Sequence, residues 1–486
     1  MMMRVAWRSL MTRPIRAAVL AAGFGFGIAV MVELLGVGHV ILEQAHAPVL
    51  FGGGDLALSG PFGPVSSARH VISTLRGASD LADRVGAISP TRREKLFLIT
   101  PQKAIQISAT GGVPSLEKSL GDPEVAGVKA WTDAAGDERW SRPEPGDVLR
   151  AMDRFHPIPD ATVSSSSWAE WLYFNGRTAD GRLRVYVTFL VGPPAKTEGR
   201  RQGSVRLQLE HDGLAATYAA GGEVDETAVL ANAPDLDIAG NRVRLEGSTY
   251  RLTFDLARGL DGRTPVSVRP EERTLSEKEK DQSLPERLSG EISLEVAPQR
   301  SLPPASIRGS GGWVSGYVVP ALSGRMRGTL RVGDGSIELA DATGYHDHNW
   351  GFWGGVRWQW GQVAHDDLSI VYGRVFPPAE VADAARIPGF LAVLGPDGPL
   401  GFSSRVTIDD ATEGRIDVRA TARGADLHLS LTVDETVRTA MAMTNLPGRQ
   451  PLNFFQLGGI YHVTGRVGAR EIDFTARGSA ETFKPQ

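Results

Sequence analysis

The 486-residue sequence contains no cysteine, and this absence excludes several kinds of chemistry at once. Without thiols the chain can form no disulfide, no cysteine nucleophile and no zinc site built on cysteine ligands. Basic charge is not in excess either, because 52 lysines and arginines stand against 56 aspartates and glutamates, giving a net charge of -4. A chain of this composition does not neutralise phosphates, so we expect no nucleic-acid partner.

Several motifs of catalysis and cofactor binding are also missing. The sequence has no GxSxG nucleophile elbow, no Walker or Rossmann glycine pattern and no HExxH zinc motif. We therefore expect no cofactor. What the chain does have is 57 glycines and 30 prolines, which suits many short strands joined by turns better than a helical fold.

Long apolar sequence is confined to one run near the N-terminus, residues 17–42, in which Glu33 is the only formal charge. A helix that spans the bilayer core needs about 20 such residues. Four arginines within residues 1–16 precede the run, and the positive-inside rule keeps them in the cytoplasm. We expect a single-pass anchor in the inner membrane with the rest of the chain in the periplasm. A signal peptide cleaved after Ala45-His46-Ala47 is the competing interpretation.

The same N-terminal stretch, "WRSLMTRPIRAAVLAAGFGFGIAV", resembles the first transmembrane segment of the permeases of lipoprotein-release and macrolide-export ABC systems. The likeness covers about the first 60 residues. It implies that components of an ABC transporter are partners of this chain, which would then be an accessory protein or a fusion.

Residues 43–159 have mixed composition and predict a small α+β connector. An amphipathic helix is expected within "SSARHVISTLRGASDLADRVG" and a strand within "EKLFLIT". The Pro-rich, charged stretch of residues 129–159 predicts an extended lead-in to the next domain.

Beyond Ser164 the apolar residues recur with a period of two. In "LRVYVTFLVG" every second residue from Leu183 to Val191 is apolar, which is typical of a half-buried strand, and "TADG" predicts a hairpin with the preceding "WAEWLYF". About sixteen such runs exceed one small barrel of about eight strands, a size that holds one ligand. We expect an all-β fold of two successive lipocalin-like antiparallel barrels, residues 160–352 and 353–486, preceded by the transmembrane helix and the connector.

The stretch "ATGYHDHNWGFWGG" concentrates the polar groups that could carry chemistry. If it is a strand, His346, His348 and Trp350 lie on one face, and Tyr345, Asp347 and Asn349 on the other. The segment "VRWQWG" repeats the pattern, with Trp358 and Trp360 on one face. If the two strands pair, a tryptophan wall lies beside an acid.

Three interpretations of the motif remain open on spacing alone. Asp347 in an aromatic cavity would have a raised pKa and could act as a general acid toward a carbon–carbon double bond. His346 and His348 could instead bind a metal with His365 or His462 as a third ligand. The histidines and Asn349 could also be hydrogen-bonded fillers of a barrel interior.

Two segments resemble the carotenoid 1,2-hydratase (hydroxyneurosporene synthase) family and its broader lipocalin-like relatives. They are "GYHDHNWG", followed by "WQWG", and "DRFHPIPDATVSSSSWAEWLYFNG", and the likeness covers about residues 153–483. The resemblance implies two successive barrels and a hydratase, a cofactor-independent hydro-lyase, in which the motif aspartate protonates a polyene. That role falls on Asp347. Leu172 stands where the family commonly has a second aromatic residue.

The resemblance also implies roles for the residues around the acid. Tyr345, His346, His348 and Asn349 would line the pocket or orient the acid, and tryptophans would form its apolar wall. The candidate substrate-binding residues are Trp350, Trp358, Trp360, Trp171, Glu170, Arg357 and His462, although a charge on a strand such as Glu170 is more usually solvated. We expect an elongated apolar ligand of the isoprenoid or polyene kind. A noncatalytic lipid-binding subunit of an ABC export system is the alternative.

Overall fold

The computed structural model describes residues 54–59, 65–122, 127–212, 214–258, 286–422, 424–440 and 452–485, with the isolated positions 15, 125 and 266–267. The predicted anchor, residues 17–42, and the cleavage site at Ala45-His46-Ala47 lie outside these residues. Within the described part of the chain, no helix is both long and apolar enough to cross a membrane.

The chain divides into two compact units. The first comprises residues 1–65 and 86–141, and the second comprises residues 66–85 and 142–486. In the first unit β1 (Arg92–Ile99) and β2 (Ala104–Gly111) form an antiparallel hairpin that is followed by α4 (Pro114–Ser119). The strand predicted in "EKLFLIT" is therefore confirmed as β1.

In the part of the second unit that the structure describes, the β structure is accompanied by the helices α3 (Ala68–Gly77), α6 (Pro145–Met152) and α7 (Glu226–Asn232). The amphipathic helix predicted from the sequence is confirmed as α3, whose N-cap Ser67 accepts a hydrogen bond from the backbone N–H of His70. The expectation that residues 129–159 are extended is wrong where α6 forms. Pro145 begins this helix, a position at which proline loses no hydrogen bond.

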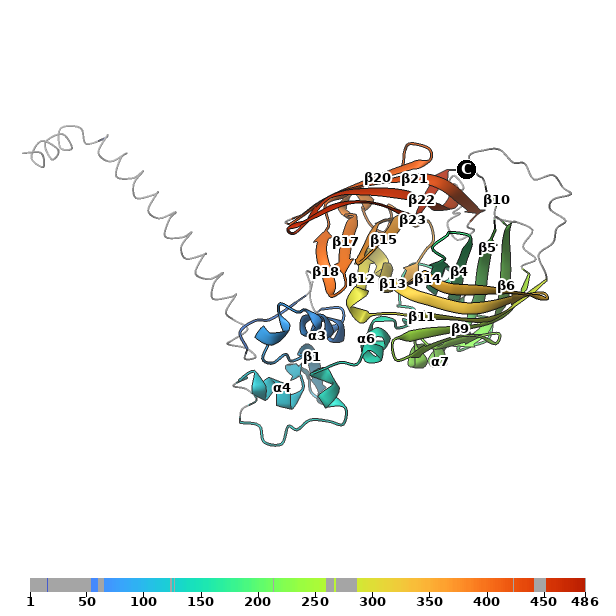
Figure 1. Ribbon diagram of the computed structural model, residues 1–486. Helices are drawn as coiled ribbons and strands as arrows, with labels where there is room; N and C mark the ends of the chain where they lie inside the picture. The colour runs from blue at the N-terminus through green and yellow to red at the C-terminus, as the bar shows by residue number, and fades with distance from the viewer. Residues whose placement is uncertain are drawn as a thin grey trace, which may run out of the picture. The chain divides into compact units, whose positions relative to one another are not determined.

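Strands make up 57% of the structure and form a closed eight-strand barrel followed by a nearly closed nine-strand barrel. We call them barrel 1 and barrel 2, and Figure 1 traces them in green to yellow and in orange to red. The expected all-β class and the two-barrel arrangement are confirmed at this level.

Barrel 1 closes because β11 pairs with both β13 and β9. Its strands, in sheet order, are β11 (Arg287–Glu295), β13 (Val314–Val332), β14 (Gly335–Phe352), β3 (Trp168–Arg177), β4 (Leu183–Pro194), β5 (Arg200–His211), β6 (Leu214–Asp225) and β9 (Thr249–Arg258). The short strands β7 (Leu236–Ile238), β8 (Asn241–Glu246) and β12 (Leu302–Arg308) extend the sheet.

Barrel 2 follows after a short connection. Its strands, in sheet order, are β18 (Gly398–Ser403), β17 (Phe390–Gly395), β16 (Leu368–Phe376), β15 (Arg357–His365), β23 (Arg470–Pro485), β22 (Leu452–Val467), β21 (Ala425–Ala440), β20 (Arg415–Ala422) and β19 (Val406–Asp409), and β10 (Val266–Ser267) pairs with β21.

The predicted hairpin is formed by β3 and β4, in which Leu172 lies opposite Phe189. The apolar residues from Leu183 to Val191 are buried at every second position, as their period of two predicts. The motif strand and the "WQWG" strand, however, do not pair. β14 lies between β13 and β3 in barrel 1, whereas β15 lies between β16 and β23 in barrel 2.

Each barrel is filled by its own apolar cluster, and a third cluster lies between the two. The third cluster joins outer faces of barrel 1, through residues such as Tyr345 and Val319, to outer faces of barrel 2, through Val371 and Phe390. Tyr317 stacks on Phe390 across this contact, with ring centroids 5.3 Å apart. The two faces of β14 therefore meet different surroundings, the interior of barrel 1 and the space between the barrels.

Candidate functional site

The alternation along β14 separates the polar groups of the motif. His346 and His348 point into barrel 1 and are completely buried, whereas Tyr345 and Asp347 lie on the outer face toward barrel 2. Gly351 ends the motif in a conformation with φ of 141°, and a Cβ there would come within 2.4 Å of the carbonyl oxygen of Val314. Glycine is required at this position because β13 approaches so closely.

The histidines belong to a buried hydrogen-bonded cluster inside barrel 1. Asp153, in the chain segment just after α6, contacts His346 Nε2 at 3.0 Å and His348 Nδ1 at 2.7 Å, and it accepts the hydroxyl of Tyr250 at 2.8 Å. Glu170 of β3 contacts the other nitrogen of His348 at 2.9 Å. We call the following residues the interior network: Asp153, His156, Glu170, His346, His348 and Tyr250.

His156 connects the interior network to solvent, because it is the one member whose side chain is partly exposed. Its Nδ1 lies 2.7 Å from Glu170, and its backbone N–H donates to the same carboxylate. Arg201, itself fully buried, donates to the backbone oxygen of His156. Glu170 is thus an interior group, and the expectation of a solvated strand charge is wrong.

The carboxylates of the interior network keep their charge although they are buried. Burial alone would raise the pKa of Asp153, but His346 and His348 hold it well below its ordinary value. Burial likewise opposes ionisation of Glu170, and hydrogen bonds from His156 and His348 lower its pKa. His348 is the cationic partner of both carboxylates. Burial disfavours its charged form, but the two carboxylates outweigh this effect and raise its pKa to about 9. The cluster is an imidazolium held between two carboxylates.

A metal site was one interpretation of the motif histidines. The structure does not bring the proposed third ligands near, because His365 stacks on Phe474 and His462 contacts Asp473, all in barrel 2. A different donor set exists: atoms of His156, Glu170 and His348 lie within 4.8 Å of one another. These donors already hydrogen bond to each other, so the set is complete as a hydrogen-bonded network.

A second group of carboxyls lies between the barrels, with a buried member on the outer face of β14 and a partly buried member on β23. Asp347 is 7% exposed, accepts the hydroxyl of Tyr345 at 2.8 Å and accepts the side-chain amide of Asn349 at 2.7 Å. From barrel 2, Glu481 of β23 faces the same space and accepts the indole N–H of Trp358 at 2.9 Å. We call Asp347 and Glu481 the inter-barrel acid pair.

Both members of the inter-barrel acid pair favour the protonated form. Burial raises the pKa of Asp347 well above its ordinary value, and the charge of Glu481 raises it further, while Tyr345 and Asn349 offset only part of the rise. Burial also raises the pKa of Glu481, to about 7. The two carboxyls interact, so they titrate as a coupled pair.

Aromatic side chains surround the inter-barrel acid pair. Tyr173 is the cross-strand neighbour of Asp347, and Trp360 is the cross-strand neighbour of Glu481, so each acid shares a face with an aromatic ring. Two neighbouring hollows lie between the barrels, and Tyr345 lines both of them. A small one of about 10 Å³ is lined by Tyr345, Trp360 and Glu481, and a larger one of about 90 Å³ lies beside it. Each is lined by residues of both barrels, whereas the sequence predicted a ligand site inside one barrel.

The remaining predicted residues are dispersed. Trp350 lies inside barrel 1, stacked on His156 with ring centroids 4.1 Å apart, and is not part of a wall beside Asp347. Trp171 packs against Trp353 and Trp358, and Arg357 is exposed beside Phe376.

Three residues of these two clusters, Asp153, His156 and Glu481, were not predicted from the sequence as site residues. Asp153 and His156 stand in "DRFHPIP", where an acid and a histidine precede prolines, a weak signal that a polar contact closes the lead-in. Glu481 stands in "SAETFKP" near the C-terminus, and nothing in that stretch marks it out. Its partner acid lies in the other barrel, which no local pattern can reveal.

Comparison with known proteins gives only distant structural likeness. No protein-family model matches the chain, and no curated protein matches it. Among solved structures, a putative AttH from Nitrosomonas europaea is 13% identical, with 66% of this chain and 93% of that chain covered and a TM-score of 0.39. CghA is 11% identical, with 69% of this chain and 97% of that chain covered and a TM-score of 0.40. The structure of CghA with Sch210972 is 12% identical to this chain, with 69% of this chain and 94% of that chain covered and a TM-score of 0.41. The two-barrel architecture accordingly stands on the strand pairings of this chain.

Proposed function

We propose that the inter-barrel acid pair adds water across a carbon–carbon double bond of a small unsaturated substrate. The observation that carries the proposal is the pair itself: a buried carboxyl from barrel 1 and a partly buried carboxyl from barrel 2, each with a raised pKa. A carboxyl with a raised pKa can hold a proton near neutral pH and exchange it with a substrate. We assign Asp347, whose pKa is raised well above its ordinary value, as the acid, and Glu481, with a pKa of about 7, as the base.

The reaction balances with these two groups. The Asp347 carboxyl gives its proton to one carbon of the double bond, and the electron pair of that bond forms the new C–H bond. The adjacent carbon becomes cationic, and the faces of Tyr173 and Tyr345 and the ionised Glu481 stabilise it. Water attacks this carbon and loses a proton to Glu481, and transfer of that proton back to Asp347 restores the enzyme.

An isotope experiment tests the proposal. Purified protein is incubated in heavy water with a panel of isoprenoids, polyenes and unsaturated fatty acids, and products are analysed by mass spectrometry. We expect deuterium and one added water in a product of at least one panel member. Asp347→Asn should lower the rate about 10²- to 10⁴-fold, the range for loss of a general acid. Asp341→Asn, on the exposed part of the same strand, is the matched control and should keep full activity.

The outcomes separate catalysis from binding. No product with any panel member, or full activity in Asp347→Asn, would overturn the proposal. Binding of lipids by both wild type and Asp347→Asn without turnover would favour the alternative, a lipid-binding subunit of an export system.

The pH dependence of turnover gives a second check. Because Glu481 must be ionised to accept a proton, the rate should rise as pH increases through about 7. It should fall once Asp347 loses its proton, because the deprotonated carboxyl cannot act as the acid. Glu481→Gln should remove the rising limb, and an unchanged limb in this variant would exclude Glu481 as the base.

We also propose that residues 17–42 anchor the protein in the inner membrane with both barrels in the periplasm, where an apolar substrate in the bilayer would be within reach. Protease protection of spheroplasts tests the topology. Barrels that stay protected in intact spheroplasts would contradict it.

A further inference from the structure

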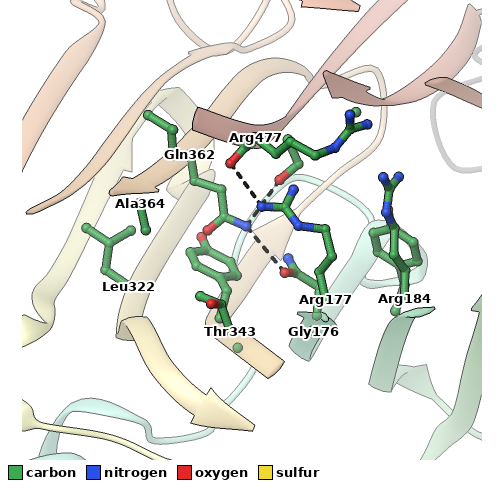
Figure 2. Close-up of a pocket in the computed structure, with 16 residues that line it drawn as sticks. Gly176, Arg177, Arg184, Leu322, Thr343, Gln362, Ala364 and Arg477 are labelled. Atoms are coloured by element: carbon green, nitrogen blue, oxygen red, sulfur yellow. Dashed lines mark hydrogen bonds between the residues drawn. The ribbon is translucent and has the colours of Figure 1, made fainter. Parts of the chain in front are cut away.

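The larger hollow between the barrels is lined by several cations. Its walls come from β3, β4, β13 and β14 of barrel 1 and from β15, β22 and β23 of barrel 2, and its volume is about 90 Å³. Arg177, Arg184 and Arg477 contribute to the lining, with Gln362 between the barrels (Figure 2). Thr343 also lines the hollow and is exposed, so the hollow is open to solvent there.

Two of the three arginines have carboxylate partners. Arg184 forms ion pairs with Glu435 and, at 3.9 Å, with Glu210. Arg477 binds Asp434 through two contacts of 2.7 Å. The charges of these two arginines are therefore balanced by acids of the protein.

Arg177 differs from both. Its guanidinium donates to the backbone oxygen of Arg477 at 3.0 Å, and Figure 2 shows it reaching toward that backbone beside the amide of Gln362. Among the residues that the structure describes, no carboxylate lies within ion-pair distance of it. Burial, followed by the charges of Arg184 and Arg477, lowers its pKa to about 10, so it is charged at neutral pH without an anion of its own.

We propose that this hollow binds an oxyanion group of the substrate, a carboxylate or a phosphate, with Arg177 as its principal contact. Arginine presents parallel N–H donors that match such groups. A volume of about 90 Å³ accommodates a head group but not a long chain. Tyr345, which donates to Asp347, lines this hollow and also the small hollow that Glu481 lines, and this position then defines the class of substrate.

This step rests on the proposed function. Arg177 and Tyr173 are four residues apart on β3 and share its outer face, and Tyr173 lies opposite Asp347. Four residues of a strand span roughly 13 Å at about 3.3 Å per residue. This spacing indicates an unsaturated amphiphile whose double bond lies about that distance from its anionic group. Such a substrate is the apolar ligand predicted from the sequence with an anionic group added.

Binding of saturated probes tests the oxyanion site without requiring turnover. Dodecanoate, dodecyl phosphate and dodecanol have equal chains and differ in head group, and their affinities are measured by calorimetry. We expect the anionic probes to bind at least about tenfold more tightly than dodecanol, and Arg177→Gln to remove this advantage. Arg331→Gln, an exposed arginine on β13, is the matched control and should change affinity by less than about twofold.

The outcomes distinguish this inference from the proposed function. Equal affinity for dodecanoate and dodecanol, or an unchanged preference in Arg177→Gln, overturns the oxyanion site even if hydration of a neutral substrate is found. Arg177-dependent binding without turnover of any unsaturated acid supports the site and counts against the hydratase. The ratio of dodecanoate to dodecyl phosphate affinities decides between carboxylate and phosphate.

Discussion

The interior network and the inter-barrel acid pair both bury carboxyl groups, yet they resolve the cost of burial in opposite ways. Burial is the largest influence on Asp153 and on Asp347 alike, and in both it favours the neutral form. Asp153 nevertheless has a lowered pKa because two imidazoles contact it. Asp347 has a raised pKa because burial and the charge of Glu481 outweigh the hydrogen bonds that it accepts from Tyr345 and Asn349.

The difference assigns different roles to the two clusters. The charges of the interior network are balanced by one another, so none is available to a ligand. The network instead fixes how the lead-in segment joins the strands of barrel 1. Asp347, whose burial favours the protonated form, accepts a hydrogen bond from Tyr345, which lines both hollows between the barrels, so Asp347 can act as a proton donor there. One strand, β14, supplies both clusters through its two faces.

The largest expected effect comes from breaking the interior network. His348→Leu removes the cation between Asp153 and Glu170 and leaves two buried charges undercompensated, so we expect a loss of about 3–5 kcal/mol in the free energy of unfolding at pH 7. Without the imidazolium, the pKa values of Asp153 and Glu170 should rise. As the pH falls these carboxylates protonate, so part of the lost free energy of unfolding should be recovered. Urea unfolding at pH 7 and pH 5 measures both effects.

His462→Leu is the control for that variant. His462 is an exposed histidine that also contacts an aspartate, and its replacement should leave the unfolding midpoint unchanged. If His348→Leu is as stable as this control, the interior network does not hold the lead-in to the barrel.

The contrast between the clusters also shows which features of the fold and of the site could be predicted from the sequence. The period of two placed His346 and Asp347 on opposite faces, and the many short strands indicated two barrels. The partner of His346 could not be predicted, because Asp153 lies 193 positions away, at the end of α6 and before the strands of barrel 1. The site was expected inside a barrel because small barrels enclose ligands, but here apolar side chains fill each interior.

The pairing of β14 with β15 was the other step that local sequence could not decide. Two neighbouring segments joined by "FWGG" suggest a hairpin, yet the chain passes from one barrel to the next at this point. As a result Trp350 lies in the core of barrel 1, while Trp358 and Trp360 reach the inter-barrel acid pair from barrel 2.

An intermediate effect is expected from neutralising the second acid. The pKa of Glu481 rises from 4.5 to about 7 in the folded protein, so wild type loses stability as the pH increases through this window. Glu481→Gln lacks this loss and can still accept the indole N–H of Trp358. Relative to wild type it should gain roughly 2 kcal/mol between pH 4 and pH 8, less than the full shift implies because the side chain is partly accessible.

Glu471→Gln, at an exposed position of the same strand, provides the baseline for thermal and urea unfolding across that pH range. A Glu481→Gln curve that runs parallel to the curve of this baseline variant would mean that the carboxyl of Glu481 is solvated, and the contrast between the two clusters would then reduce to Asp347 alone.

The smallest expected effect sharpens the contrast at Asp347 itself. Tyr345→Phe removes the hydroxyl that donates to Asp347, a hydrogen bond that contributes about 1 kcal/mol and lowers the pKa of the carboxyl. Its loss should raise that pKa further and move the falling limb of the pH–rate profile to higher pH. Tyr317→Phe alters a tyrosine of the same inter-barrel cluster that makes no hydrogen bond to Asp347, and it should leave the limb in place. A limb that moves to lower pH in Tyr345→Phe, or that moves equally in both variants, would show that Tyr345 does not tune the acid through its hydroxyl.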